Sequence, residues 1–110
     1  MLDRLRVVEL GAGRAVAYAG SLFAQLGATV VRIEAAHDAA LPEALRCWLN
    51  AGKRTVALDL AAAEGLDACV RLLDRADILI HGGAAVAAAA PSLAPERLAQ
   101  ARPALVLAVV

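Results

Sequence analysis

The 110-residue sequence predicts an α/β fold, specifically a Rossmann-like open parallel sheet flanked by helices. Short β-branched runs alternate with longer segments whose apolar residues recur at helical spacing. Strands separated by helices pair in parallel through crossover connections. The length fits a single domain over residues 1–110, and 61% hydrophobic residues supply a core and exclude a disordered chain.

Five strands are expected, at residues 5–10, 29–33, 54–60, 77–80 and 104–110. The last of these contains LVLAVV, has no charged residue and reaches the final residue. We therefore expect a sheet that is truncated within its fifth strand.

Helices are expected at residues 15–26, 42–50, 61–75 and 95–101, with a small-residue linker at 35–41 and a Gly/Ala-rich loop at 81–93. The first helix should pack through Ala15, Ala19, Leu22, Phe23 and Leu26, which share one face. In the second helix the expected packing anchors are Leu45 and Trp48, and in the third they are Leu66, Cys69, Val70 and Leu73.

Charge and composition argue against several classes of partner. Eleven basic and eleven acidic side chains give a net charge of zero, and three aromatic residues offer little stacking surface, so we expect no nucleic-acid and no membrane binding. Cys47 and Cys69 are too few for a disulfide scaffold or a four-cysteine zinc site, and we expect buried, inert thiols, no metal and a cytoplasmic location.

The turn after the first strand has glycines suited to a bound ligand. Gly11 and Gly13 precede the first helix, and Glu34 follows Gly13 by 21 residues, where an acidic residue holds a ribose in dinucleotide-binding folds. Val16 takes the place of the third glycine of that fingerprint. The segment also resembles the first motif of S-adenosylmethionine-dependent methyltransferases, and a tight turn without a ligand fits equally.

Four longer blocks point elsewhere: LDRLRVVELG, YAGSLFAQLGATVVRIE, LNAGKRTVALDLAAAEGLDACVRLLDRADILI and APERLAQARPALVLAVV. Together they resemble the class III CoA-transferase family of CaiB/BaiF type, which includes formyl-CoA transferase, carnitine CoA-transferase and α-methylacyl-CoA racemase. The resemblance spans nearly the whole chain. Its most specific part is residues 50–60 followed by Glu64-Gly65, which is similar to the family's N-x-x-K-R-S-x-x-L-D-L stretch.

The resemblance implies the N-terminal, Rossmann-like part of a larger subunit that binds CoA or acyl-CoA along the carboxyl ends of its strands. It further implies a homodimer, or pairing with a second chain of the same type. The family transfers CoA through an aspartyl anhydride or racemises acyl-CoA. That aspartate follows the fifth strand, so the resemblance assigns no catalytic residue within these 110 residues.

The CoA contacts that the resemblance carries onto this chain fall on three segments, comprising Arg14 and Ala15, then Leu58, Asp59 and Leu60, then Gly82 and Gly83. Some positions depart from the family pattern. His81-Gly82-Gly83 replaces E-N-F, Val16-Ala17 replaces a glycine-proline pair, and Ala35 stands where some members have a basic residue.

Several polar residues admit two interpretations. Lys53 and Arg54 fit either steering of the CoA diphosphate or a charge pair at a strand edge or subunit contact. Asp59 fits either the adenosine end of CoA or a cap on the following helix. His81 fits a general base, but the lack of a neighbouring carboxylate favours a hydrogen-bonded loop histidine.

Three functional hypotheses follow. The first is the CoA-binding part of a class III CoA-transferase or racemase. The second is a degenerate, non-catalytic module that pairs with another subunit or domain. The third is a methyltransferase or NAD-type Rossmann fragment.

Overall fold

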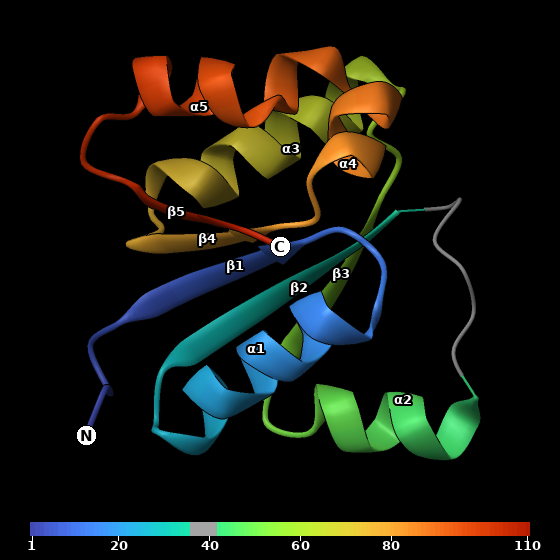
Figure 1. Cartoon of the computed structure of the whole chain (residues 1–110), viewed down its shortest axis with the longest axis vertical. Helices are drawn as coiled ribbons and strands as arrows, with labels where there is room; N and C mark the ends of the chain where they lie inside the picture. The colour runs from blue at the N-terminus through green and yellow to red at the C-terminus, as the bar shows by residue number, and fades with distance from the viewer. Residues whose placement is uncertain (36–41) are drawn as a thin grey trace.

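The computed structural model describes residues 1–35 and 42–110. They form a five-stranded parallel sheet in the order β3-β2-β1-β4-β5 (Figure 1). The strands are β1 Arg6–Leu10, β2 Thr29–Ala35, β3 Arg54–Leu58, β4 Ile78–His81 and β5 Val106–Val109. The predicted α/β fold with an open parallel sheet is confirmed.

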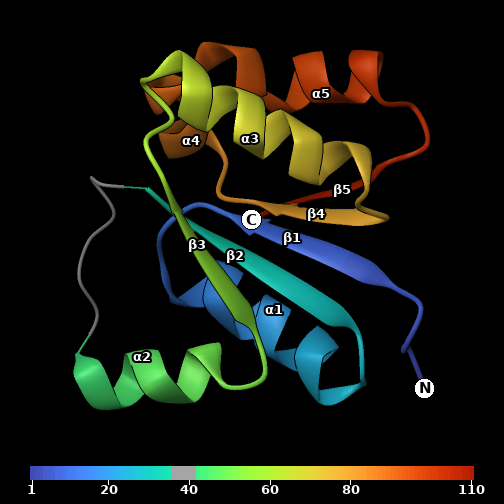
Figure 2. The same cartoon turned by 180° about the vertical axis from the view of Figure 1, so that it is seen from behind.

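Helices cover both faces of this sheet. On one face lie α1 Arg14–Gln25 and α2 Glu43–Asn50, and on the other lie α3 Ala63–Asp74, α4 Ala84–Ala89, the 3₁₀ turn η1 Pro91–Leu93 and α5 Pro95–Ala101 (Figures 1 and 2). The predicted loop at 81–93 therefore contains α4 and η1. Apart from Ala35, which ends β2, the predicted linker at 35–41 lies outside the described residues.

The order of the strands places a topological switch beside β1. The chain leaves β1 to form β2 on one side and later returns as β4 on the other, so Leu10 is in register with both Ile33 and His81. The helix that follows β1 and the helix that follows β4 cover opposite faces of the sheet (Figure 1). In open parallel sheets, ligands bind outside the carboxyl ends of the strands at such a point.

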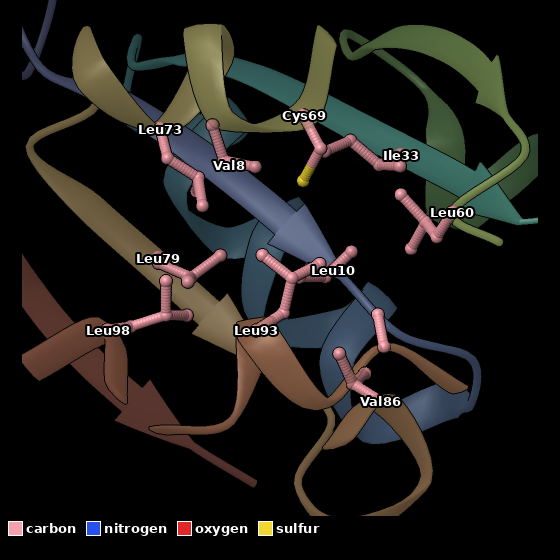
Figure 3. Packing of buried hydrophobic residues seen from close by; sticks show 11 residues of the cluster. Val8, Leu10, Ile33, Leu60, Cys69, Leu73, Leu79, Val86, Leu93 and Leu98 are labelled. Atoms are coloured by element: carbon pink, nitrogen blue, oxygen red, sulfur yellow. The ribbon is translucent and has the colours of Figure 1, made fainter. Parts of the chain in front are cut away.

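Two apolar clusters hold the helices to the sheet. The larger one joins β1, β2 and β4 to α3, α4, η1 and α5, and its fully buried members include Leu10, Ile33, Cys69, Leu73 and Leu79 (Figure 3). The smaller one lies beneath α1 and is formed by Val7, Val16, Ala28, Val30 and Ile80. Because apolar residues are buried on both faces of the sheet, the inner strands read as near-continuous hydrophobic runs.

The predicted packing face of α1 is confirmed in part. Ala19 and Phe23 pack against the smaller cluster, but Leu22 is 44% exposed and Ala15 and Leu26 are exposed.

The fully buried residues of α1 are Val16, Ala17, Gly20 and Ser21. The cause is the side chain of Glu9, which lies beneath the helix: a Cβ at Gly20 would overlap its carboxylate. Small residues therefore lie above Glu9, and Leu22 and Leu26 fall on the outer side.

Two further expectations about buried side chains need correction. Trp48 is 56% exposed and stacks on Tyr18, with 6.3 Å between ring centroids, while Leu49 is the buried residue of α2. The reason is that α2 packs beside α1 at the periphery, so one narrow side of it is covered. Cys47, on the same helix, is exposed, whereas Cys69 is buried as expected.

We predict that Leu73→Ala lowers the free energy of unfolding by about 2–5 kcal/mol, because it removes a fully buried side chain between α3 and the sheet. The matched control is Leu22→Ala on α1, which should change it by about 0.5 kcal/mol or less. Urea denaturation of both variants measures the difference. Equal losses would contradict the assignment of the buried faces.

The two thiols should differ in reactivity. Burial raises the pKa of the Cys69 thiol to about 11, so at pH 8 it stays protonated and inaccessible, whereas the Cys47 thiol is exposed. We expect Ellman's reagent at pH 8 to titrate one thiol per native chain and two in guanidinium chloride. A Cys47→Ser variant that still reacts promptly in the native state would show that Cys69 is accessible.

Candidate functional site

The centre of the candidate site is a close approach of two backbones. Gly11 follows β1 and Gly82 follows β4, and a Cβ at Gly11 would lie 2.8 Å from the Gly82 Cα. The Gly82 N–H also donates to the Leu10 carbonyl at 2.8 Å, which continues the β1–β4 pairing past the strand ends. Gly11 has φ +124°, a conformation that side chains disfavour. A side chain at Gly11 would therefore clash with the Gly82 backbone, and one at Gly82 would be tightly confined, so the two turns are in direct backbone contact at the switch point.

The N-terminus of α1 follows this backbone contact in the chain. Gly13 is its N-cap residue with φ +114°, no side chain caps the helix end, and its first turn has no acidic residue. Arg14 and Ala15, the first two residues of α1, are exposed. The free amides of a helix N-terminus and a neighbouring guanidinium together favour an anion such as a phosphate.

The turn after β4 is fixed by His81, which is completely buried. The Gly83 N–H donates to His81 Nδ1 at 2.9 Å, and His81 Nε2 lies 2.7 Å from the Leu93 carbonyl oxygen. With Nδ1 acting as acceptor, the ring hydrogen is on Nε2, which donates to Leu93. The expected hydrogen-bonded histidine is confirmed, although it ends β4 instead of lying in a loop. Both ring nitrogens are engaged, which argues against a general base.

A second part of the site lies at the ends of β2 and β3. Glu34, Ala35, Ala57, Leu58 and Asp59 line a shallow depression of about 310 Å³. The exposed Asp59 carboxylate accepts the Ala61 N–H at 3.0 Å, so it stabilises the turn before α3. The residue at the cap position of α3 is Ala62, and the expected cap at Asp59 is therefore displaced to this turn.

The predicted contact residues thus fall into two groups on one edge of the sheet. Arg14 and Ala15 begin α1 after β1, and Gly82 and Gly83 follow β4. Leu58 ends β3 and residues 59 and 60 follow it, and β2 separates β3 from β1. The Leu60 side chain is buried in the larger apolar cluster, so it can offer a ligand its backbone alone. Glu34 lies 3.8 Å from Arg32 Nε and is paired within the sheet.

A buried ion cluster beneath α1 was missed by the sequence reasoning. The Glu9 carboxylate, fully buried, pairs with Arg32 Nη1 at 2.8 Å and with Lys53 Nζ at 2.5 Å. The Lys53 ammonium also donates to the Ala17 carbonyl at 2.7 Å. Burial lowers the pKa of Lys53, and the neighbouring Glu9 opposes that shift. The signal in the sequence was a carboxylate, Glu9, inside an otherwise apolar strand.

This cluster corrects the interpretation of Lys53, whose side chain is buried under α1 and does not steer a ligand. Lys53 joins the start of β3 to the carboxylate of β1 and to the backbone of α1. It therefore fixes α1, whose N-terminus is part of the candidate site. Glu9 is likewise a structural residue and not a ligand contact.

We predict that Glu9→Gln and Lys53→Met each lower the free energy of unfolding by about 3–5 kcal/mol, because each leaves a buried charge without its partner. The double variant should lose less than the sum of the two, since the Glu9 and Lys53 charges are then both removed and Arg32 alone is left without its Glu9 partner. Chemical denaturation of the four proteins completes the cycle, with the exposed Arg97→Met as a control. Strictly additive losses would contradict the pairing.

Within residues 1–35 and 42–110, no group of three or more His, Cys, Asp or Glu side chains is placed to hold a metal ion. In the same part of the chain, no helix has the length and apolar character needed to cross a membrane.

Known proteins match the chain over nearly its whole length. Over 108 residues it is 33% identical to α-methylacyl-CoA racemase of Mus musculus, a match that covers 98% of this chain and 27% of the racemase. Over 81 residues it is 35% identical to an acyl-CoA transferase of Gibberella moniliformis, covering 74% of this chain and 14% of the transferase. A solved CAIB/BAIF family protein of Brucella suis has a TM-score of 0.84 and 27% identity, over 98% of this chain and 32% of that one.

The chain thus spans about a quarter of the length of the racemase and a third of that of the solved protein. The sequence profile of CoA-transferase family III matches residues 2–110. That match and the shared sheet confirm the resemblance seen in the four sequence blocks, and the chain belongs to CoA-transferase family III.

Proposed function

We propose that this chain binds CoA or acyl-CoA at the carboxyl edge of its sheet, as the CoA-binding part of a class III CoA-transferase or racemase. The observation that carries the proposal is the exposed, uncapped N-terminus of α1, which follows the Gly11–Gly82 backbone contact at the switch point, in a member of this family.

The N-terminus of α1 suits a phosphate of CoA. It supplies backbone donors and the positive end of the helix dipole, and exposed Arg14 supplies a positive charge. A Cβ added to Gly13 would have no heavy atom within 4 Å, which leaves room for a ligand against the backbone. These features bind an anion without any base- or acyl-specific contact.

The depression at β2 and β3 suits the adenosine end of the same ligand. The depression lies on the same edge of the sheet as the N-terminus of α1. Two strand spacings, roughly 10 Å, separate β3 from β1. Leu58 is half-buried there, and exposed Asp59 offers a carboxylate to a ribose or adenine donor. A ligand with a diphosphate between an adenosine and a long arm can reach both places.

We propose no reaction for this chain, because the family resemblance assigns no catalytic residue within these 110 residues. The relatives include a racemase and an acyl-CoA transferase, and both names refer to an acyl-CoA. We therefore propose recognition of the CoA part, which the two reactions share. Pairing with a second copy, implied by the family resemblance, stays a prediction.

Titration calorimetry of the 110-residue chain tests the proposal. We expect CoA to bind, and Arg14→Gln to weaken binding about tenfold or more, because a charge-assisted bond to phosphate contributes about 1.5–3 kcal/mol. Arg97→Gln, on exposed α5, is the matched control and should leave the affinity unchanged.

NAD⁺ and S-adenosylmethionine serve as comparison ligands. NAD⁺, which shares the adenosine and diphosphate, should bind more weakly than CoA, and S-adenosylmethionine, which has no phosphate, should give no measurable heat. Tighter binding of either one than of CoA would favour the dinucleotide or methyltransferase hypothesis. No binding of CoA at millimolar concentration would contradict the proposal and favour a degenerate module that acts through a partner.

A further inference from the structure

We infer that His81 is a positioning residue for the CoA site: its neutral imidazole holds Gly83, and through Gly83 the Gly82 backbone that packs on Gly11. The inference rests on the proposed function for what is bound, and on the hydrogen bonds of β4 for how the site is held. No part of the CoA-contact pattern carried from the family includes His81.

The first step is the geometry of the ring. His81 is the last residue of β4 and has no exposed surface, so its ring is fixed by packing and by hydrogen bonds on both sides. Nδ1 accepts the Gly83 N–H at 2.9 Å, and Nε2 donates to the Leu93 carbonyl at 2.7 Å. One rigid ring thus links the turn after β4 to η1, 12 residues further along the chain.

The second step is what Gly83 requires. It is buried, has φ +76°, and is the N-cap residue of α4. Its carbonyl accepts the Ala87 N–H at 3.2 Å, so its position sets where α4 begins. Without the bond to His81, the Gly83 N–H would be a buried donor without that acceptor, which is unfavourable unless the turn rearranges.

The third step connects this turn to the start of α1. Gly82 stands between His81 and Gly83, donates to the Leu10 carbonyl, and packs so closely on Gly11 that a Cβ at Gly11 would clash with the Gly82 backbone. A rearranged Gly83 turn therefore moves Gly82 against Gly11. Since Gly11 leads into the turn before α1, the shift reaches the free amides at the N-terminus of that helix.

Two substitutions separate the two hydrogen bonds of His81. In His81→Asn the amide oxygen can take the place of Nδ1 and accept the Gly83 N–H. In His81→Gln the amide nitrogen can take the place of Nε2 and donate to Leu93. Both variants should be destabilised, because each loses one of the two hydrogen bonds of His81 and keeps the other. Leu79→Ala, which removes a buried side chain of β4 without touching the turn, is the control for destabilisation alone.

We expect CoA affinity, measured by calorimetry, to follow the Gly83 bond and not the stability. The dissociation constant should stay within threefold of wild type in His81→Asn and Leu79→Ala, and should rise at least tenfold in His81→Gln. Equal weakening in the Asn and Gln variants, or weakening in Leu79→Ala as large as in His81→Gln, would overturn the inference.

A second measurement keeps the inference testable if wild type itself fails to bind CoA, an outcome that would refute the proposed function alone. Amide hydrogen exchange followed by NMR should show a protected Gly83 N–H in wild type and His81→Asn, and a fast-exchanging one in His81→Gln. The imidazole nitrogen shifts should report the Nε2–H tautomer. Unchanged Gly83 exchange in His81→Gln would show that the histidine does not hold the turn.

Discussion

The backbone contact between Gly11 and Gly82 is the constraint on which the rest of the site depends. It allows the ends of β1 and β4 to stay in register past the last strand residues, while the chain leaves them toward opposite faces of the sheet. A side chain at Gly11 would clash with the Gly82 backbone, and one at Gly82 would press on Gly11. The direction of α1 and the start of α4 both follow from this one approach, and a phosphate-bearing ligand can contact the backbone amides at the start of α1 directly.

The buried carboxylate of Glu9 is the second constraint, and it acts on α1. Burying one negative charge is costly unless cations meet it, and Arg32 of β2 and Lys53 before β3 do so at hydrogen-bonding distance. The carboxylate also sits where the helix comes closest, so Gly20 is needed above it. Three strands and one helix are thereby joined through a few polar atoms in an aliphatic core. The cluster specifies one position for α1, and with it the location of the helix N-terminus.

The alternation of strands and helices, the open parallel sheet and the family could be predicted because they depend on hydrophobic periodicity and on blocks of residues with characteristic spacing. The order of the strands was not among the predictions. The packing face of α1 could not, since the apolar periodicity of Leu22 and Leu26 predicts a buried stripe, and the Glu9 carboxylate that reverses it comes from another element. The exposure of Trp48 depends on α2 being peripheral, which one helix cannot reveal. His81 was recognised as hydrogen-bonded, but its partners, Gly83 and Leu93, follow from the path of the chain after β4.

The most direct test of a CoA site at the switch point is to locate the ligand on the structure. Amide resonances of the ¹⁵N-labelled chain, recorded with increasing CoA, should shift first in the turn at residues 11–15 and at Gly82 and Gly83, with smaller shifts at residues 58–60. Shifts that cluster instead at the opposite edge of the sheet, where Arg6, Arg54 and Arg75 border a groove beside α3, would place the ligand elsewhere and contradict the account.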